Sequence, residues 1–185
     1  MPVAEMAKAL RLPGVRQIGI VVRDLARTAG AYQALGIGPW YRLRPKGMEV
    51  ELRGRPLDTR IDIAVAYSGR TQLELIEHGG GDPNLYDEHL RERGEGLHHL
   101  GFCVRNVARR VEEVRALGIG VLQRGTIRTP TGGVTRFAYL DTREAGGVII
   151  ELIESRLGRL YIGMSRPVIA VGRLLGDFER VRSDG

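Results

Sequence analysis

The sequence predicts an α+β domain in which tandem βαβββ modules form one curved mixed sheet. The main observation is an internal repeat: residues 17–40 align without a gap with residues 99–122, and 10 of the 24 paired positions are identical. A second match pairs the segment LELIE (73–77) with IELIE (150–154). Because both segments alternate like strands, each half is expected to end in a strand that carries glutamate.

The first half contains the signals of a strand, a helix and further strands. Alternation of apolar and polar residues predicts strands over 17–22, 60–67 and 72–77, with a short strand near 41–44 or 49–53. Asp24 can cap a helix near 25–35, and Gly36 can end it. In the second half Asn106 and Gly118 have the corresponding roles, and strands are expected over 134–140 and 148–154.

These signals divide the chain into five parts. They are an N-terminal extension (1–14), a first module (15–78), a linker with a short helix (79–96), a second module (97–154) and a C-terminal helical extension (155–185). In the last part Leu157, Leu160, Tyr161 and Met164 fall at helical spacing, and Pro167 interrupts the pattern. The extension is expected either to pack on the domain or a partner subunit, or to form a lid over the site.

Composition narrows the class of partner. The net charge is +6 and 26 of the 28 basic residues are arginine, but they are dispersed and aromatic residues make up only 5%. This pattern argues against nucleic-acid binding and is more consistent with a small, anionic substrate. No apolar run approaches membrane-spanning length, and no signal peptide is recognisable. Cys103, the single cysteine, excludes an internal disulfide, so we expect a cytoplasmic protein without membrane contact.

Four polar side chains are expected to meet inside the sheet. Gln17 and His99 are equivalent in the repeat, as are Glu74 and Glu151. Strand alternation places His99 on the same face as Gly101 and turns His98 away from it. Buried carboxylates are costly unless they are paired or bind a metal. Arginines could pair with them, but one divalent ion (zinc, cobalt, nickel, manganese or iron) would explain all four positions.

The chain resembles the vicinal oxygen chelate superfamily, which includes glyoxalase I, methylmalonyl-CoA epimerase, extradiol dioxygenases and bleomycin-resistance proteins. The resemblance covers about residues 15–155 and is carried by QIGIVVRDL (17–25), TQLELIEH (71–78), RGEGLHHLGFCV (93–104) and GGVIIELIE (146–154). It implies the vicinal oxygen chelate fold and metal ligands at Gln17, Glu74, His99 and Glu151. This quartet is similar to that of eukaryotic glyoxalase I, whereas an extra epimerase-type glutamate is not recognisable around 40–56.

The expected activity is that of a metal-dependent isomerase or epimerase that moves a proton next to a carbonyl or thioester. Glu151 and Glu74 are the candidate catalytic pair, because two carboxylates beside a planar intermediate can exchange protons with both of its faces. A non-catalytic resistance-type binding protein and an extradiol-type dioxygenase are the alternatives. We also expect a homodimer. The candidate substrate-binding residues lie on predicted strands or at their ends: Trp40, Arg60, Tyr67, Arg136 and Tyr139.

Overall fold

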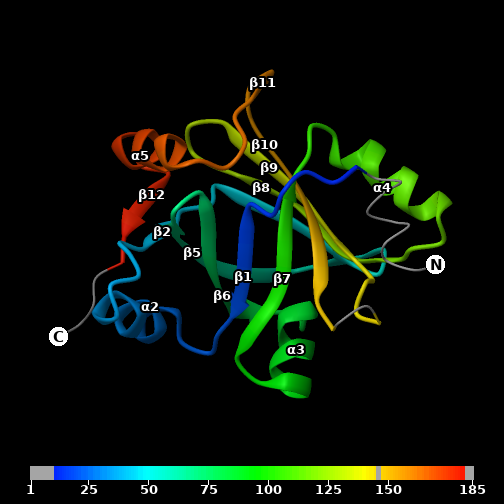
Figure 1. Cartoon of the computed structure of the whole chain (residues 1–185), viewed down its shortest axis with the longest axis horizontal. Helices are drawn as coiled ribbons and strands as arrows, with labels where there is room; N and C mark the ends of the chain where they lie inside the picture. Colours follow the sequence, from blue (N-terminus) through cyan, green and yellow to red (C-terminus); the bar gives the residue numbers. More distant parts are fainter. Residues whose placement is uncertain (1–10, 145–146, 182–185) are drawn as a thin grey trace.

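The computed structural model describes residues 11–144 and 147–181, and its centre is one strongly curved mixed sheet (Figure 1). Neighbouring strands follow the order β12-β2-β5-β6-β1-β7-β10-β9-β8-β3-β4, and β11 pairs with β10. This architecture confirms the predicted fold class. The first module consists of β1 (Gln17–Val21), α2 (Leu25–Ala34), β2 (Tyr41–Leu43), β5 (Thr59–Ser68) and β6 (Thr71–Gly81). The second consists of β7 (Gly96–Cys103), α4 (Val107–Ala116), β8 (Val121–Arg128), β9 (Gly133–Leu140) and β10 (Ile149–Leu157).

The two modules meet where β1 pairs antiparallel with β7. Gln17 lies opposite Gly101 and Gly19 lies opposite His99, so an internal two-fold axis exchanges the two pairs. The parallel neighbours continue this symmetry, because Glu74 on β6 lies beside Gly19 and Glu151 on β10 lies beside Gly101. The positions that are equivalent in the repeat are therefore also equivalent in space.

The second glutamate of each repeated segment has a different role from the first. Glu77 accepts a hydrogen bond from the backbone N–H of Leu25 (2.8 Å), and Glu154 accepts one from that of Val107 (3.1 Å). Both N–H groups belong to the first turn of a helix, where backbone donors lack intrahelical partners. Since the two glutamates of a segment are three residues apart, one faces the interior of the sheet and the other fastens a helix outside it.

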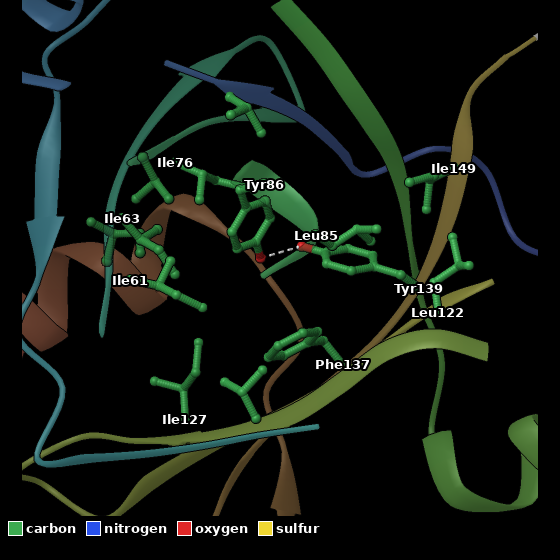
Figure 2. Packing of buried hydrophobic residues seen from close by; sticks show 14 residues of the cluster. Ile61, Ile63, Ile76, Leu85, Tyr86, Leu122, Ile127, Phe137, Tyr139 and Ile149 are labelled. Carbon is green, nitrogen blue, oxygen red and sulfur yellow. Dashed lines mark hydrogen bonds between the residues drawn. The ribbon is translucent and has the colours of Figure 1, made fainter. Parts of the chain in front are cut away.

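Apolar side chains form three clusters, one inside the curved sheet and two outside. The outer face of the first module packs against Leu25 and Ala29 of α2, and that of the second against valines of α4. The inner cluster includes Tyr86 on α3 (Leu85–Arg93) and Ile169 on α5 (Arg166–Leu174). Figure 2 shows Tyr86 meeting Tyr139 among the inner isoleucines. Helices α3 and α5 thus contribute to the concave side of the sheet, whereas α2 and α4 cover its outside.

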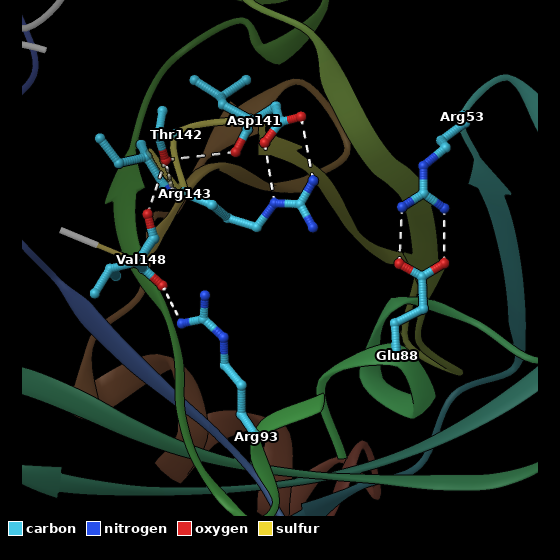
Figure 3. Close-up of polar contacts among 10 residues, drawn as sticks. Arg53, Glu88, Arg93, Asp141, Thr142, Arg143 and Val148 are labelled. Atoms are coloured by element: carbon cyan, nitrogen blue, oxygen red, sulfur yellow. Dashed lines mark hydrogen bonds and ion pairs between the residues drawn. The ribbon is translucent and has the colours of Figure 1, made fainter. Parts of the chain in front are cut away.

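A hairpin breaks the symmetry between the modules. The strands β3 (Gly47–Leu52) and β4 (Arg55–Leu57) lie between β2 and β5 in the sequence, but β3 pairs with β8 of the second module. At its turn Arg53 forms a bidentate ion pair with Glu88 of α3, with both N–O distances 2.7 Å (Figure 3). The sequence predicts one short strand in this region, whereas the structure has three, β2, β3 and β4.

The C-terminal extension differs from the expected run of helix. Strand β10 continues through Leu157, and Leu160–Tyr161 folds back on it as β11, so the apolar spacing over 157–164 belongs mainly to strands. Pro167 lies in the first turn of α5, where its missing N–H costs little, and it does not interrupt that helix. The short strand β12 (Phe178–Arg180) then pairs with β2. None of the helices in the described residues is long and apolar enough to cross a membrane.

The contact of β1 with β7 makes Gly19 sensitive to substitution. A Cβ atom at Gly19 would lie 1.9 Å from Cε1 of the buried His99 ring. We therefore expect Gly19→Ala to displace that ring and to lower the free energy of unfolding by about 1–3 kcal/mol, measured by chemical denaturation. Gly47→Ala is the control, because a Cβ there meets no atom within 4 Å. Equal stability of the two variants would show that this packing is not as tight as described.

Candidate metal and catalytic site

The four residues that the repeat singles out converge inside the sheet. His99 is fully buried, and its Nε2 atom lies 3.0 Å from Glu151 Oε2, 3.3 Å from Gln17 Oε1 and 3.5 Å from Glu74 Oε2. Each side chain comes from one of the four central strands, and the two-fold axis relates them in pairs. The predicted constellation is thus one cluster with three oxygens around one imidazole nitrogen.

A chain of hydrogen bonds sets the orientation of Gln17. Its amide nitrogen donates to Gln72 Oε1 (2.9 Å), which leaves Oε1 of Gln17 directed at His99. Gln72 in turn donates from Nε2 to the hydroxyl of Tyr67 (2.8 Å). In the second module the position that corresponds to Gln72 is occupied by Ile149. The hydrogen bonds that orient the Gln17 amide therefore have no counterpart at His99.

A β-bulge in β7 turns His98 toward the interior, which makes the predicted outward orientation of this side chain wrong. Gly19 pairs with His99 and Ile20 pairs with Leu97, so His98 is the extra residue and the alternation of faces is interrupted. His98 is 2% exposed, and its Nδ1 atom lies 3.1 Å from Nδ1 of His99. Strict alternation from the sequence gives no signal for such a bulge.

A cavity of about 130 Å³ adjoins the cluster. Gln17, Glu74 and Glu151 line it on the strand side, and the C-terminal extension contributes Met164, Val168, Ile169 and Phe178. The carboxylate of Asp177 holds this extension to the turn between β8 and β9, since it accepts hydrogen bonds from Thr129 Oγ1 (2.9 Å), the Thr131 N–H (3.1 Å) and the Thr131 hydroxyl. The extension thus packs on the domain, as the first of the two expected roles requires, while a lid function stays a prediction.

A family model described as the glyoxalase/bleomycin resistance protein/dioxygenase superfamily matches residues 16–139. The chain belongs to this superfamily. The predicted resemblance is thereby confirmed, and members of this superfamily typically bind a divalent metal ion. The match ends before β10, so Glu151 and the C-terminal extension lie beyond it.

Solved structures of methylmalonyl-CoA epimerases are similar to the chain. The Mycobacterium tuberculosis enzyme has 23% identity and a TM-score of 0.54, with 77% of this chain and 87% of that chain covered. A Streptomyces coelicolor variant in complex with 2-nitronate-propionyl-CoA has 25% identity and a TM-score of 0.53, with 77% and 94% covered. An epimerase in complex with methylmalonyl-CoA gives the same four values as that variant. No curated protein sequence matches significantly.

The donor atoms of the quartet, three oxygens and one imidazole nitrogen, are of the kinds that bind divalent metal ions. Bonds of about 2.1 Å to one ion would separate neighbouring ligand atoms by about 3.0 Å in an octahedron and about 3.4 Å in a tetrahedron, close to the distances around His99 Nε2. Glu151 Oε2 is buried and makes no hydrogen bond. No group of three or more His, Cys, Asp and Glu side chains in the described residues is arranged as a preformed site. Binding would therefore require the carboxylates to turn from the imidazole toward the ion.

Burial and mutual repulsion perturb the ionisation of the quartet. Burial, followed by the charge of Glu151, raises the pKa of Glu74 to about 8. Burial alone would lower the pKa of His99, but the negative charge of Glu151 at 3.0 Å, followed by that of Glu74, raises it above its usual range. Burial holds the pKa of His98 well below its usual range. The neutral His98 can therefore accept a hydrogen bond at Nδ1 from His99, which leaves Nε2 of His99 directed at the carboxylates.

Two of the five predicted substrate-binding residues lie near the cavity. Tyr139 lines it, and Tyr67 reaches it through Gln72. Trp40 is fully buried in the cluster beneath α2, where its indole N–H donates to Ile37 O (2.9 Å). Arg60 lies against Gly79, and Arg136 lines a groove between α4 and the β3–β4 hairpin. The structure does not bring these last three residues to the quartet.

The sequence patterns did not predict Tyr86, His98, Gln72 or the lining residues of the extension as parts of the site. Tyr86 and Tyr139 share a hydroxyl–hydroxyl hydrogen bond of 2.9 Å beside the cavity. Gln72 was detectable in principle, because it shares a strand face with Glu74 and pairs with Gln17. Tyr86 comes from α3, outside the repeat, so no comparison of the two halves could reveal it.

The raised pKa values predict that the metal-free protein loses stability as the pH rises. Groups whose pKa is higher in the folded state stabilise it fully below their unfolded pKa, and that stabilisation disappears as the pH rises through the folded pKa. Below about pH 6.5 the lowered pKa of His98 acts in the opposite direction, so with Glu74 near 8 and His99 also raised the free energy of unfolding should fall between about pH 6.5 and 8. Denaturation in chelator at several pH values measures this slope.

Glu74→Gln should reduce that slope, because the amide carries no titrating proton. Glu112→Gln is the matched control, since Glu112 is exposed on α4 and far from the quartet in the sheet. An unchanged slope in Glu74→Gln would contradict the burial of an ionisable carboxyl at this position.

Proposed function

We propose that the protein is a metal-dependent isomerase or epimerase that moves a proton next to a carbonyl or thioester. The observation that carries this proposal is the pair of carboxylates, Glu74 and Glu151, at two-fold-related positions around His99 in one cavity. Gln17, Glu74, His99 and Glu151 would hold one divalent ion. Such an ion, when bound, polarises a carbonyl oxygen and makes the neighbouring C–H bond more acidic.

Within this proposal the two glutamates transfer the proton. One carboxylate oxygen takes the proton from the substrate carbon, and the electron pair of the broken C–H bond forms an enolate. The other carboxyl returns a proton to the opposite face, which inverts the centre, or to the adjacent carbon, which isomerises the substrate. Both outcomes leave the number of protons on the enzyme unchanged after a complete cycle.

The surroundings of the quartet favour a small reacting group. The cavity of about 130 Å³ has isoleucine and aromatic walls, including Tyr139 and Ile153. Solved structures of similar epimerases are complexes with methylmalonyl-CoA and 2-nitronate-propionyl-CoA. We therefore propose a short acyl thioester as the substrate class, with a hemithioacetal as the alternative that the same quartet would serve.

Neither alternative activity has comparable support from the geometry. A dioxygenase of the facial-triad type needs two histidines and one carboxylate, but His98 lines a separate, smaller cavity and its Nδ1 atom contacts His99. Two further glutamates of the sheet, Glu49 and Glu51, pair with Arg128 and Arg124 on the surface and are not available as bases in this cavity. A binding protein would not need two carboxylates around one imidazole.

Replacing the proposed base tests the mechanism. Glu151→Gln keeps a ligand oxygen but removes the proton acceptor, so we expect deuterium uptake at the substrate α-carbon to fall about 10²–10⁴-fold, while metal content falls much less. NMR with acyl-CoA and glutathione-hemithioacetal substrates measures the uptake. Glu154 lies on the same strand but on its outer face, so Glu154→Gln should change neither the deuterium uptake nor the metal content. Absence of exchange in the metal-loaded wild type on every substrate would favour the binding protein.

The contact between the two histidines predicts a supporting role for His98 in metal binding. His98→Ala removes the acceptor for His99 Nδ1–H, so the metal affinity should fall about 10–100-fold. His98→Asn offers an amide oxygen as acceptor and should retain more of the affinity. His89→Ala is the control, because His89 packs on His98 without touching the quartet. Metal titration followed by mass spectrometry measures these affinities, and equal affinity in all variants would contradict this role.

The homodimer and the cytoplasmic location stay predictions of the sequence. Light scattering of the purified full chain tests the first, and fractionation of cells tests the second.

A further inference from the structure

A second, larger pocket lies beside the reaction cavity. Its volume is about 490 Å³, and it is formed where the segment leading into β1, the β5–β6 turn and the segment between β11 and α5 meet. Arg16 precedes β1, Arg70 lies in the β5–β6 turn, and Arg166 is the first residue of α5. In Figure 1 this end of the sheet lies opposite the end that α3 occupies.

The pocket is strongly basic and lacks acidic side chains. No aspartate or glutamate lines it, and none of its three arginines forms an ion pair within residues 11–144 and 147–181. Arg166 instead donates to the backbone oxygen of Tyr67 (3.3 Å), and its guanidinium carbon lies 5.9 Å from the centre of the Tyr67 ring. Three uncompensated positive charges around one concave surface attract an anion.

The reaction cavity and the basic pocket share a wall. Residues 162–165 line both, so this segment separates the two spaces. Tyr67 lines the basic pocket, and the hydrogen-bonded chain from Tyr67 through Gln72 to Gln17 connects it with the quartet. A ligand long enough to cross residues 162–165 would place its two ends in the two spaces.

We propose that the basic pocket binds a phosphate or pyrophosphate group at the tail of the substrate. A single carboxylate accepts one bidentate arginine, whereas a phosphoryl group has enough oxygens to accept bonds from several guanidinium groups at once. The pocket volume also exceeds what a carboxylate needs. This inference rests on the proposed function only for the statement that the phosphate belongs to the substrate; the anion site itself does not depend on catalysis.

Direct binding tests the anion site without any turnover. Inorganic pyrophosphate, titrated calorimetrically into metal-free full-length protein at low salt, should bind at one site per chain and more weakly as salt rises. Arg70→Gln and Arg166→Gln should each weaken binding about three- to tenfold. Arg91→Gln, which removes the same charge from α3, should leave it unchanged. No binding, or equal weakening in all three variants, would overturn the site.

A second measurement asks whether the substrate uses this pocket. In the exchange assay, an acyl-CoA should have a lower KM than the same acyl group on N-acetylcysteamine, which lacks phosphate, and Arg70→Gln should reduce this difference. If pyrophosphate binds but the two thioesters have equal KM, the pocket does not hold the substrate tail. If pyrophosphate binds and no thioester exchanges, the proposed function fails while the anion site stands.

Discussion

The antiparallel pairing of β1 with β7 is the constraint on which the site depends. It places Gly19 against His99 and Gly101 against Gln17, so each large polar side chain occupies the space above a residue without a Cβ atom. The flanking strands β6 and β10 place Glu74 and Glu151 on either side of this pair. Burying two carboxylates costs free energy that apolar packing elsewhere must offset. The arrangement is therefore expected only where the carboxylates have a chemical use.

The repeat made most of this arrangement predictable, because equivalent residues in a duplicated strand keep the same register and face. The fold class and the meeting of Gln17, Glu74, His99 and Glu151 follow from it. Features outside the repeat did not follow. The bulge at His98 depends on pairing across strands, and the position of Arg136 depends on which edge the β3–β4 hairpin joins. Apolar spacing over 157–164 predicted a helix. In the structure the first of these residues ends β10, and the next ones form β11, which pairs antiparallel with β10.

The two halves have diverged in how they support the same quartet. Gln17 is held by Gln72 and Tyr67 on one side, whereas His99 is backed by the neutral His98 among aromatic rings on the other. An amide ligand must present its oxygen, and an imidazole ligand must present its unprotonated nitrogen. Each support satisfies one of these requirements. A symmetric scaffold therefore gives two chemically different ligands, and its two carboxylates face unequal surroundings.

The β3–β4 hairpin bears on how the chain reaches its native state. Its residues precede most of the first module's sheet, yet their ladder partner is β8, more than seventy residues later. Neither half can complete its hydrogen-bonded edge from its own sequence, so a chain cut between the repeats would expose β8 as an unpaired strand open to aggregation. Closing this long-range contact raises the contact order and slows folding. The duplicated halves thus form a single cooperative folding unit.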